Sequence, residues 1–258
     1  MIPKVLILKA SGTNRDGDAA AAFTLAGAEP QILPLAVLRT SQIPWQSYDI
    51  LVLPGGFSYA DALGAGRLLA LDLTAYFTDQ AQAFVASGKP VIGICNGFQA
   101  LIKSGILPGL PADNGPAATL TFNESGRFEC RWVALRPVST RCLWTRGLGV
   151  LECPVAHGEG RFVTRDAQTL AQLQSNDQIA LVYASAAGDL AQGAYPANPN
   201  GSIMDIAGIC NQAGNVLGLM PHPEDHIFPT RHPHWPRGEA RGSGLTLFQN
   251  GVKFAQER

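Results

Sequence analysis

Cys95 has the sequence setting of a nucleophile. It follows the apolar run Val91–Ile94 and precedes a helix-like segment, in the frame Gly93-Ile-Cys95-Asn-Gly97. A strand that turns sharply into a helix through small residues is the nucleophile-elbow pattern, here with Cys in place of Ser. Such a turn exposes the thiol beyond the end of a strand, and the helix N-terminus favours the reactive thiolate. The alternative is a buried structural cysteine, but the two flanking glycines favour the elbow.

A histidine and a carboxylate near the C-terminal end supply the partners that such a thiol needs. In Met220-Pro-His-Pro-Glu224, His222 and Glu224 are two residues apart, so in an extended segment their side chains point the same way. A carboxylate beside an imidazole fixes its tautomer and stabilises its cation, as in a catalytic triad. Taken alone, the segment fits a polar surface turn better than a triad. Together with the elbow it predicts a triad of Cys95, His222 and Glu224.

Backbone amides near a glycine pair are candidates for an oxyanion hole. A predicted strand runs directly into Pro54-Gly55-Gly56-Phe57. Because glycine lets backbone amides approach a ligand closely, the amides near Gly56 and Phe57 are expected to join that of Asn96 around a developing oxyanion. An ordinary strand-to-loop turn is the alternative.

A second histidine and carboxylate, His157 and Glu159, are also two residues apart, between Pro154 and Phe162. The pair is either a rival dyad in a glycine-containing binding loop or part of a structural hairpin. The residue types alone leave both interpretations open.

The stretch Pro221–Gly242 is rich in Pro, His, Arg and Gly and is expected to be an ordered surface loop. Its histidines lack a helical His-x-x-x-His spacing and a nearby cysteine, so they are expected to be loop residues, and no metal site is predicted. Its arginines are expected to form a solvated face, with an acidic partner surface as the alternative. These residues are His226, His232, His234, Arg231, Arg237 and Arg241.

The overall composition is that of a globular protein. The chain has 258 residues, is 46% apolar and 15% charged, and carries 19 basic against 20 acidic residues. This balance excludes a strongly basic nucleic-acid binder judged by overall charge, and no apolar run is long enough to suggest a membrane span. Five cysteines, an odd number without a C-x-x-C pair, suggest neither a disulfide framework nor a zinc ribbon. We therefore expect a soluble, cytoplasmic protein with free thiols.

Strand and helix signals alternate in the first half, which predicts an α/β fold with a mainly parallel sheet and helices on both faces. Strands are expected at Lys4–Ala10, Gln31–Leu35, Asp49–Leu53 and Val91–Ile94, and helices at Asn14–Ala28, Thr74–Ser87 and Asn96–Lys103. The second half is richer in β signals. Hairpins are expected within Thr119–Val138 and around Asn211–Gly214, strands at Gly149–Val155, Ile179–Tyr183, Ser202–Cys210 and Val216–Met220, and a closing helix at Gly244–Gln256.

These motifs resemble class I (triad) glutamine amidotransferases, and among them the family of glutaminase subunits of phosphoribosylformylglycinamidine synthase. The elbow and the Pro-His-Pro-Glu segment are typical of the whole class, whereas other stretches are similar to this branch. The similar stretches are Gly12–Asn14, Pro54–Tyr59, Gly93–Gln99, Gly126–Trp132, Ala156–Arg161, Asn198–Ser202, Asp205–Gly208 and Gly218–Glu224. The resemblance implies a flavodoxin-like sheet in a single domain, residues 1–258, the triad Cys95, His222 and Glu224, and a glutamine pocket involving Gly55, Gly56, Phe57 and Gln99.

The resemblance also implies a function in a complex. Such a chain hydrolyses L-glutamine and passes ammonia to a large synthetase subunit, which converts formylglycinamide ribonucleotide to its amidine, with a small third subunit often bridging the two. No Walker A loop is present, so ATP and magnesium are expected to be used by the synthetase, and this chain is expected to carry no cofactor. The alternatives are an amidotransferase for another synthetase, a cysteine hydrolase of the related thiol-elbow group, and a non-catalytic scaffold.

Overall fold

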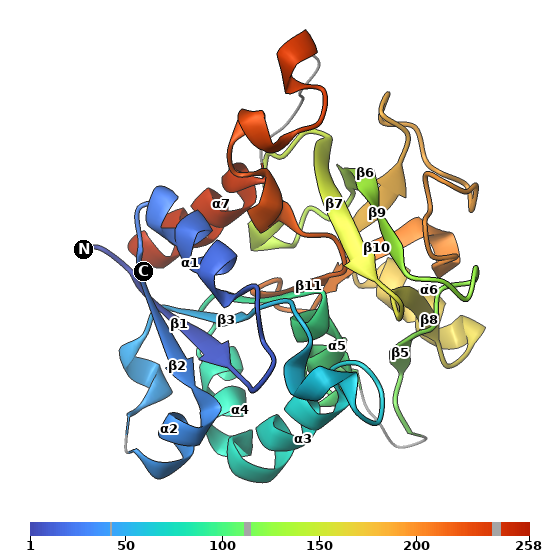
Figure 1. Ribbon diagram of the computed structural model, residues 1–258. Coiled ribbons are helices and arrows are strands. Elements are labelled where there is room, and N and C mark those ends of the chain that lie inside the picture. The colour runs from blue at the N-terminus through green and yellow to red at the C-terminus, as the bar shows by residue number, and fades with distance from the viewer. Residues whose placement is uncertain (42, 111–114, 239–243) are drawn as a thin grey trace.

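Short apolar segments of the first half form the parallel part of a central sheet. A computed structural model describes residues 1–41, 43–110, 115–238 and 244–258. In that part of the chain the strand order begins β2-β1-β3-β4-β11, and each neighbouring pair is parallel (Figure 1). The bounds are β1 Lys4–Lys9, β2 Glu29–Pro34, β3 Ile50–Leu53, β4 Val91–Ile94 and β11 Val216–Leu219. This order is that of flavodoxin-like sheets, whose ligands bind beyond the carboxyl ends of the strands.

The second half extends the same sheet with antiparallel strands. The order continues from β11 through β10, β9 and β6 to β7, and each of these neighbouring pairs is antiparallel. Two further strands, β5 and β8, pair with each other in a separate ribbon. The bounds are β5 Ala118–Thr121, β6 Glu129–Pro137, β7 Leu151–His157, β8 Arg161–Thr164, β9 Ile179–Ala184 and β10 Ile206–Cys210. The fold is thus α/β, as predicted.

Helices cover both faces of the parallel strands (Figure 1). Helices α1 and α7 pack together on one face, and α3, α4 and α5 lie on the other. The bounds are α1 Asp16–Leu25, α2 Leu35–Thr40, α3 Arg67–Tyr76, α4 Thr78–Ala86, α5 Asn96–Lys103, α6 Ala167–Ser175 and α7 Leu245–Gln256. Edge-to-face contacts of Phe23 with Phe248 (centroids 5.1 Å apart) and with Trp144 (6.4 Å apart) join α1, α7 and the segment before β7. This aromatic cluster anchors α7 behind the sheet.

Several sequence predictions are confirmed and others are wrong. The strand Val91–Ile94, the helix Asn96–Lys103 and the hairpin at Asn211–Gly214 are confirmed. The hairpin within Thr119–Val138 is wrong, because β5 pairs with β8 and β6 pairs with β7 and β9. The single helix Thr74–Ser87 is also wrong, because the chain forms α3 and α4 with a break at Phe77, whose buried ring stacks on Trp45. The sequence reasoning missed α2, α6 and β8.

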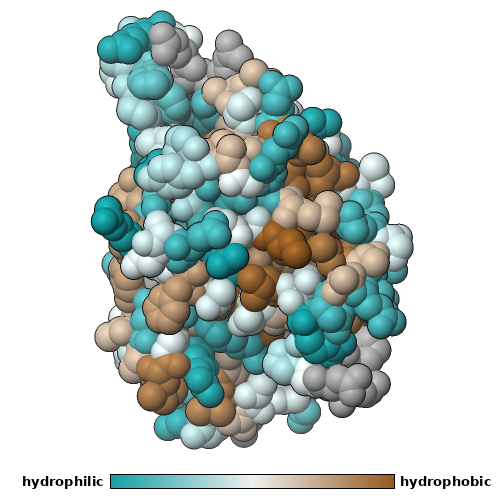
Figure 2. Space-filling view, turned by 90° about the vertical axis from the view of Figure 1, so that its right-hand side faces the viewer, coloured by the Kyte–Doolittle hydropathy of each residue, from teal (hydrophilic) through white to brown (hydrophobic). Residues whose placement is uncertain are grey.

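In the described residues, no helix has both the length and the apolar character needed to cross a membrane. Figure 2 shows the face on the side of β5, β8 and α6, where hydrophobic side chains gather near the middle among hydrophilic ones.

Candidate active site

Cys95 lies on a strained turn between β4 and α5. Its φ of 48° and ψ of −103° are rare for a side-chain-bearing residue and cost on the order of 1–3 kcal/mol. The turn depends on glycine at both flanks. A Cβ on Gly97 would lie 1.8 Å from the carbonyl oxygen of Leu53, and one on Gly93 would lie 2.5 Å from Cδ1 of Leu101. Such close packing of helix on sheet holds the strained turn, and the geometry is that of a nucleophile elbow.

His222 and Glu224 form a buried pair beside this thiol. His222 Nδ1 lies 2.7 Å from Glu224 Oε1, and the two residues are 2% and 0% exposed. The His222 backbone amide donates to the Pro154 carbonyl at 2.8 Å, which ties the segment after β11 to β7. Because the carboxylate accepts the Nδ1 proton, Nε2 is the nitrogen left to exchange a proton with a neighbour.

The electrostatics of this pair favour an imidazolium. Burial by itself opposes the charge on His222, but the Glu224 carboxylate and the nearby Cys95 side chain outweigh it, so the pKa of His222 is raised well above its ordinary value. A histidine that stays protonated can hold a thiolate beside it and then donate a proton to a leaving group.

The absence of a side chain at Gly55 provides the space that the His222 imidazole occupies. A Cβ at this position would lie 2.7 Å from His222 Cε1 and 3.5 Å from the Cys95 Cβ. Gly56 has a φ of +125°, and its Cβ would lie 2.5 Å from Asn14 Oδ1. The glycine pair after β3 therefore fits between the thiol–imidazole pair and the turn before α1.

The predicted oxyanion amides have different surroundings. The Phe57 amide donates to the Gly12 carbonyl at 3.3 Å, so it is directed to the turn before α1 rather than to a ligand. The Asn96 amide is the first of α5, where helix geometry offers no intrahelical acceptor. The assignment of Gly56 and Asn96 to an oxyanion hole stays a prediction, and that of the Phe57 amide does not fit this conformation.

A cavity of about 140 Å³ opens beside Cys95. It is smaller than the roughly 300–1,000 Å³ of sites for drug-sized ligands, so it suits a small substrate. Three exposed phenylalanines line it, and two of their rings, those of Phe57 and Phe128, stack with centroids 6.5 Å apart. The lining residues are Gly56, Phe57, Asp61, Ala65, Cys95, Gln99, Phe122, Phe128, Ala156, His157, Gly158 and Glu159.

The side chains of Gln99 and Asn96 form hydrogen bonds that hold the wall of this cavity. Asn96 Nδ2 donates to Asp61 Oδ1 at 3.0 Å and to Gln99 Oε1 at 3.2 Å. Gln99 Nε2 in turn donates to the Glu159 carbonyl at 2.7 Å. Gln99, predicted to bind glutamine, thus lines the cavity while its amide is engaged in holding the loop after β7.

Two carboxylates in the cavity wall were not assigned to the site by sequence reasoning. Burial and the neighbouring Glu159 raise the pKa of Asp61. Glu159 accepts from the Ala65 amide at 3.2 Å and lies 3.9 Å from Lys103 Nζ. Asp61 ends a run of three side-chain-bearing residues with positive φ, Tyr59 to Asp61. The sequence indicated Glu159 only as a possible partner of His157, and it gives no signal for Asp61.

The rival dyad does not form. His157 Nδ1 lies 3.1 Å from Asn123 Oδ1, and the carboxylate of Glu159 is directed to Ala65 and Lys103 instead. Burial and the charge of His222 lower the pKa of His157 to about 3. His157 is therefore a neutral residue of the cavity wall.

The loop that follows the triad segment packs against β6 and β7. His232 Nε2 lies 3.4 Å from Glu152 Oε2, and Trp132 makes edge contacts with the rings of His226 and His232. Arg231 donates to the Glu224 carbonyl at 3.3 Å, so this arginine holds the triad segment instead of only facing solvent. In the described ranges, no three His, Cys, Asp or Glu residues are placed to hold a metal ion. His234 and Arg237 are exposed, and Arg241 lies outside the described residues.

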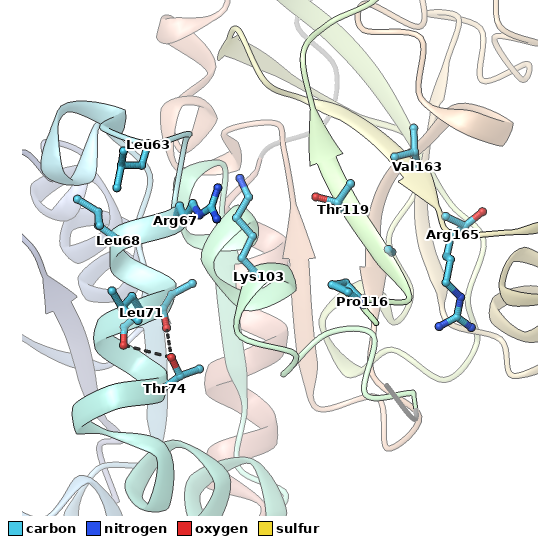
Figure 3. Close-up of a pocket in the computed structure, with 13 residues that line it drawn as sticks. Leu63, Arg67, Leu68, Leu71, Thr74, Lys103, Pro116, Thr119, Val163 and Arg165 are labelled. Atoms are coloured by element: carbon cyan, nitrogen blue, oxygen red, sulfur yellow. Dashed lines mark hydrogen bonds between the residues drawn. The ribbon is translucent and has the colours of Figure 1, made fainter. Parts of the chain in front are cut away.

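A larger cleft of about 800 Å³ separates α3 from the β5–β8 ribbon (Figure 3). Arg67 and Lys103 lie close together on its α3 side, and Arg165 lies on the far wall. None of the described residues that line it is a cysteine, a histidine or a carboxylate. The smaller cavity, which contains Cys95, is therefore the better candidate for chemistry.

Comparisons with known proteins agree with this geometry. The family model for the CobB/CobQ-like glutamine amidotransferase domain matches residues 2–255. The phosphoribosylformylglycinamidine synthase subunit PurQ of Treponema denticola is 52% identical and covers 98% of this chain and 99% of its own. The subunit of the same name from Dehalococcoides mccartyi is 43% identical and covers 98% of each. A chain in the structure of PurLQS from Thermotoga maritima superposes with a TM-score of 0.75 at 30% identity, covering 98% of this chain and 99% of that one.

Proposed function

This chain belongs to the CobB/CobQ-like glutamine amidotransferase family, and we infer from that membership that it is the glutaminase subunit of a phosphoribosylformylglycinamidine synthase. It hydrolyses L-glutamine to glutamate and delivers ammonia to a synthetase subunit, which converts formylglycinamide ribonucleotide to formylglycinamidine ribonucleotide with ATP in de novo purine biosynthesis. The relatives match this chain over nearly its whole length, which supports the transfer of their activity.

We propose that Cys95, His222 and Glu224 perform the hydrolysis. The Cys95 thiolate attacks the side-chain carbonyl carbon of glutamine, and the amides near Gly56 and Asn96 stabilise the oxyanion. The His222 imidazolium donates its Nε2 proton to the departing nitrogen, and the neutral imidazole then activates the water that cleaves the thioester. The observation that carries the proposal is the 2.7 Å His222–Glu224 pair, buried next to a cysteine on a strained elbow.

We propose that the same cavity orients the substrate by charge. Asp61 and Glu159 line it together with Cys95. Their carboxylates suit the α-ammonium group of glutamine, so the side-chain amide of a bound substrate extends toward the thiol. Gln99 supports this arrangement by holding the Glu159 carbonyl at 2.7 Å.

The partner is a large synthetase subunit, and the substrate of this chain is glutamine. We propose further that ATP and magnesium act only in the synthetase, that a small third subunit bridges the two proteins, and that this chain uses no cofactor of its own. The proposed steps at Cys95 need only a thiolate, an imidazolium and water, which supports the last point.

We also propose a cytoplasmic location. All five cysteines are free thiols, including the exposed Cys130, which suits a reducing compartment.

The test is glutamate release by the purified chain, alone and with its synthetase subunit, formylglycinamide ribonucleotide and ATP. Release that rises with the partner and is matched by amidine formation is the expected result. Release without amidine would assign the chain to another synthetase. Absence of release with a competent partner would refute the glutaminase and favour a scaffold.

A further inference from the structure

One oxygen of the Glu224 carboxylate is bonded and the other is not. Oε1 lies 2.7 Å from His222 Nδ1, whereas Oε2 is buried and makes no hydrogen bond with any described residue. One hydrogen bond does not fix the orientation of a carboxylate, which has two oxygens and about four acceptor sites. His222 has an anchor of its own, because its amide donates to the Pro154 carbonyl at 2.8 Å. The position of Glu224 therefore depends on what holds the 3₁₀ helix Pro223–His226, to which it belongs.

Two arginines bond to this 3₁₀ helix at neighbouring positions. Arg231 Nη1 donates to the carbonyl oxygen of Glu224 at 3.3 Å. Arg15 Nη1 donates at 3.2 Å to Oδ1 of Asp225, the residue that follows Glu224. Arg231 lies seven residues beyond Glu224 in the same loop, whereas Arg15 and Asp225 are 210 residues apart in the sequence. The Arg15 bond therefore ties the segment that carries the triad carboxylate to a distant element.

Asp18 joins the two arginines at the start of α1. Its Oδ2 accepts from Arg15 Nη1 at 3.2 Å, and its Oδ1 lies 3.9 Å from Arg231 Nη1. Arg15 immediately precedes α1 and Asp18 lies in the first turn of that helix. The same turn is held on the sheet by Asp16, whose Oδ2 lies 2.6 Å from Nζ of Lys9 in β1. The two arginines are thus connected to an element with a fixed position.

The four charged side chains form a network, which we call the charged clamp: Arg15, Asp18, Asp225 and Arg231. Two positive and two negative charges balance, and the side chains are between 16% and 38% exposed. Burial and the neighbouring Glu224 raise the pKa of Asp225, and the charge of Arg15 opposes the rise. Because several charges share partners, the clamp holds one geometry better than an isolated surface pair does.

Building on the proposed glutaminase function, we propose that Arg15 is a positioning residue that holds the Glu224 carboxylate against the His222 imidazole. Arg15 acts through Asp225 and Asp18, and it is not among the described residues that line the Cys95 cavity. Without Arg15 the 3₁₀ helix shifts and the carboxylate turns away from His222 Nδ1. Proton transfer by His222 then slows, while glutamine still binds in a cavity to which Arg15 does not contribute.

The test compares variants of the full chain in the complex with the synthetase subunit. Arg15→Met keeps most of the alkyl stem and removes the charge. Arg15→Lys should restore the function in part, because both bonds of Arg15 come from the single nitrogen Nη1 and a lysine ammonium has three donors. Arg165→Met is the matched control, since Arg165 forms a 2.9 Å ion pair of similar exposure with Asp166 and neither residue lines the Cys95 cavity.

We expect Arg15→Met to lower kcat for glutamate release by about 5- to 20-fold and to leave KM within about twofold, with most of the loss recovered in Arg15→Lys. The loss should stay below the roughly 10²-fold of a 1 Å misplacement, because the Pro154 carbonyl still holds His222. Asp225→Asn should cause a similar loss. The double variant should be no slower than the slower single variant, since both changes break the same pair. Arg165→Met and amidine formation from added ammonium salt should keep wild-type rates.

Several results would overturn the proposal. A kcat for Arg15→Met within about twofold of wild type, or a loss of the same size in Arg165→Met, would show that Arg15 does not position the triad. A rise in KM at unchanged kcat would place Arg15 in substrate binding, and losses that multiply in the double variant would separate it from Asp225. A lower Tm with a loss that Arg15→Lys does not recover would show a role in the fold alone. Each of these leaves wild-type glutamate release intact, whereas absence of wild-type release would refute the glutaminase function instead.

Discussion

Gly55→Ala should separate the position of the His222 imidazole from the stability of the fold. The added Cβ would lie 2.7 Å from His222 Cε1, whereas carbon atoms in contact are ordinarily about 3.5–4.0 Å apart. Gly55 does not have a positive φ, so alanine fits its backbone, and the strain falls on the ring. The imidazole must therefore move by roughly 1 Å away from Gly55 and leave its present position beside the thiol.

A displacement of that size in a proton-transfer group costs about 10²-fold in rate. We expect kcat for glutamate release to fall by about that factor in the complex, and the rate of Cys95 alkylation by iodoacetamide to fall with it, because the imidazolium no longer stabilises the thiolate. Tm should change by only a few degrees. Gly17→Ala is the matched control, since its Cβ would meet nothing within 4 Å. A Gly55→Ala enzyme with native Tm and a kcat within twofold of wild type would refute the assigned role of His222.

Three further substitutions test the thiol, the pair and the elbow. Cys95→Ala should abolish glutamate release, while the complex still forms amidine from added ammonium salt. Glutamine turnover that persists in this variant would exclude Cys95 as the nucleophile. Glu224→Gln should lower kcat by about 10²–10⁴-fold. It also removes the carboxylate that raises the pKa of His222. Because the imidazolium is lost as pH rises through that pKa, the alkaline limb of the pH–kcat profile should move to lower pH. A limb that stays in place would contradict the pairing of His222 with Glu224. Gly97→Ala brings a Cβ to 1.8 Å from the Leu53 carbonyl oxygen. It should lower the free energy of unfolding by about 3 kcal/mol and Tm by about 6–12 °C in a calorimetric scan. A native Tm would show that the backbone around the elbow can shift to accept the added methyl group.

The features that the sequence predicts correctly are those that depend on neighbouring residues. The strand Val91–Ile94 and the helix Asn96–Lys103 meet at a glycine-flanked cysteine, and all the signals for that turn lie within a few residues. His222 and Glu224 are in contact as their spacing suggested, although Glu224 lies in the 3₁₀ helix Pro223–His226 rather than in the expected extended segment.

The features that sequence reasoning misses depend on distant partners. Strand β5 pairs with β8 rather than with β6, a choice that register and packing make between segments some 40 residues apart. The break between α3 and α4 follows the burial of Phe77 against Trp45. Asp61 lines the cavity from a backbone with positive φ, a conformation that its residue type does not reveal.

The pKa values of two histidines close to Cys95 are shifted in opposite directions, and the surroundings of the two rings explain the difference. Glu224 and Cys95 favour the imidazolium of His222, which the proposed proton transfer to the leaving nitrogen requires. His157 is neutral because burial and the charge of His222 lower its pKa, and because its Nδ1 lies 3.1 Å from Asn123 Oδ1, an amide oxygen rather than a carboxylate. A second carboxylate in place of Asn123 would make His157 a proton acceptor that competes with His222. With an amide there, His157 does not compete for that proton, so His222 is the histidine suited to the proton transfers of the proposed reaction.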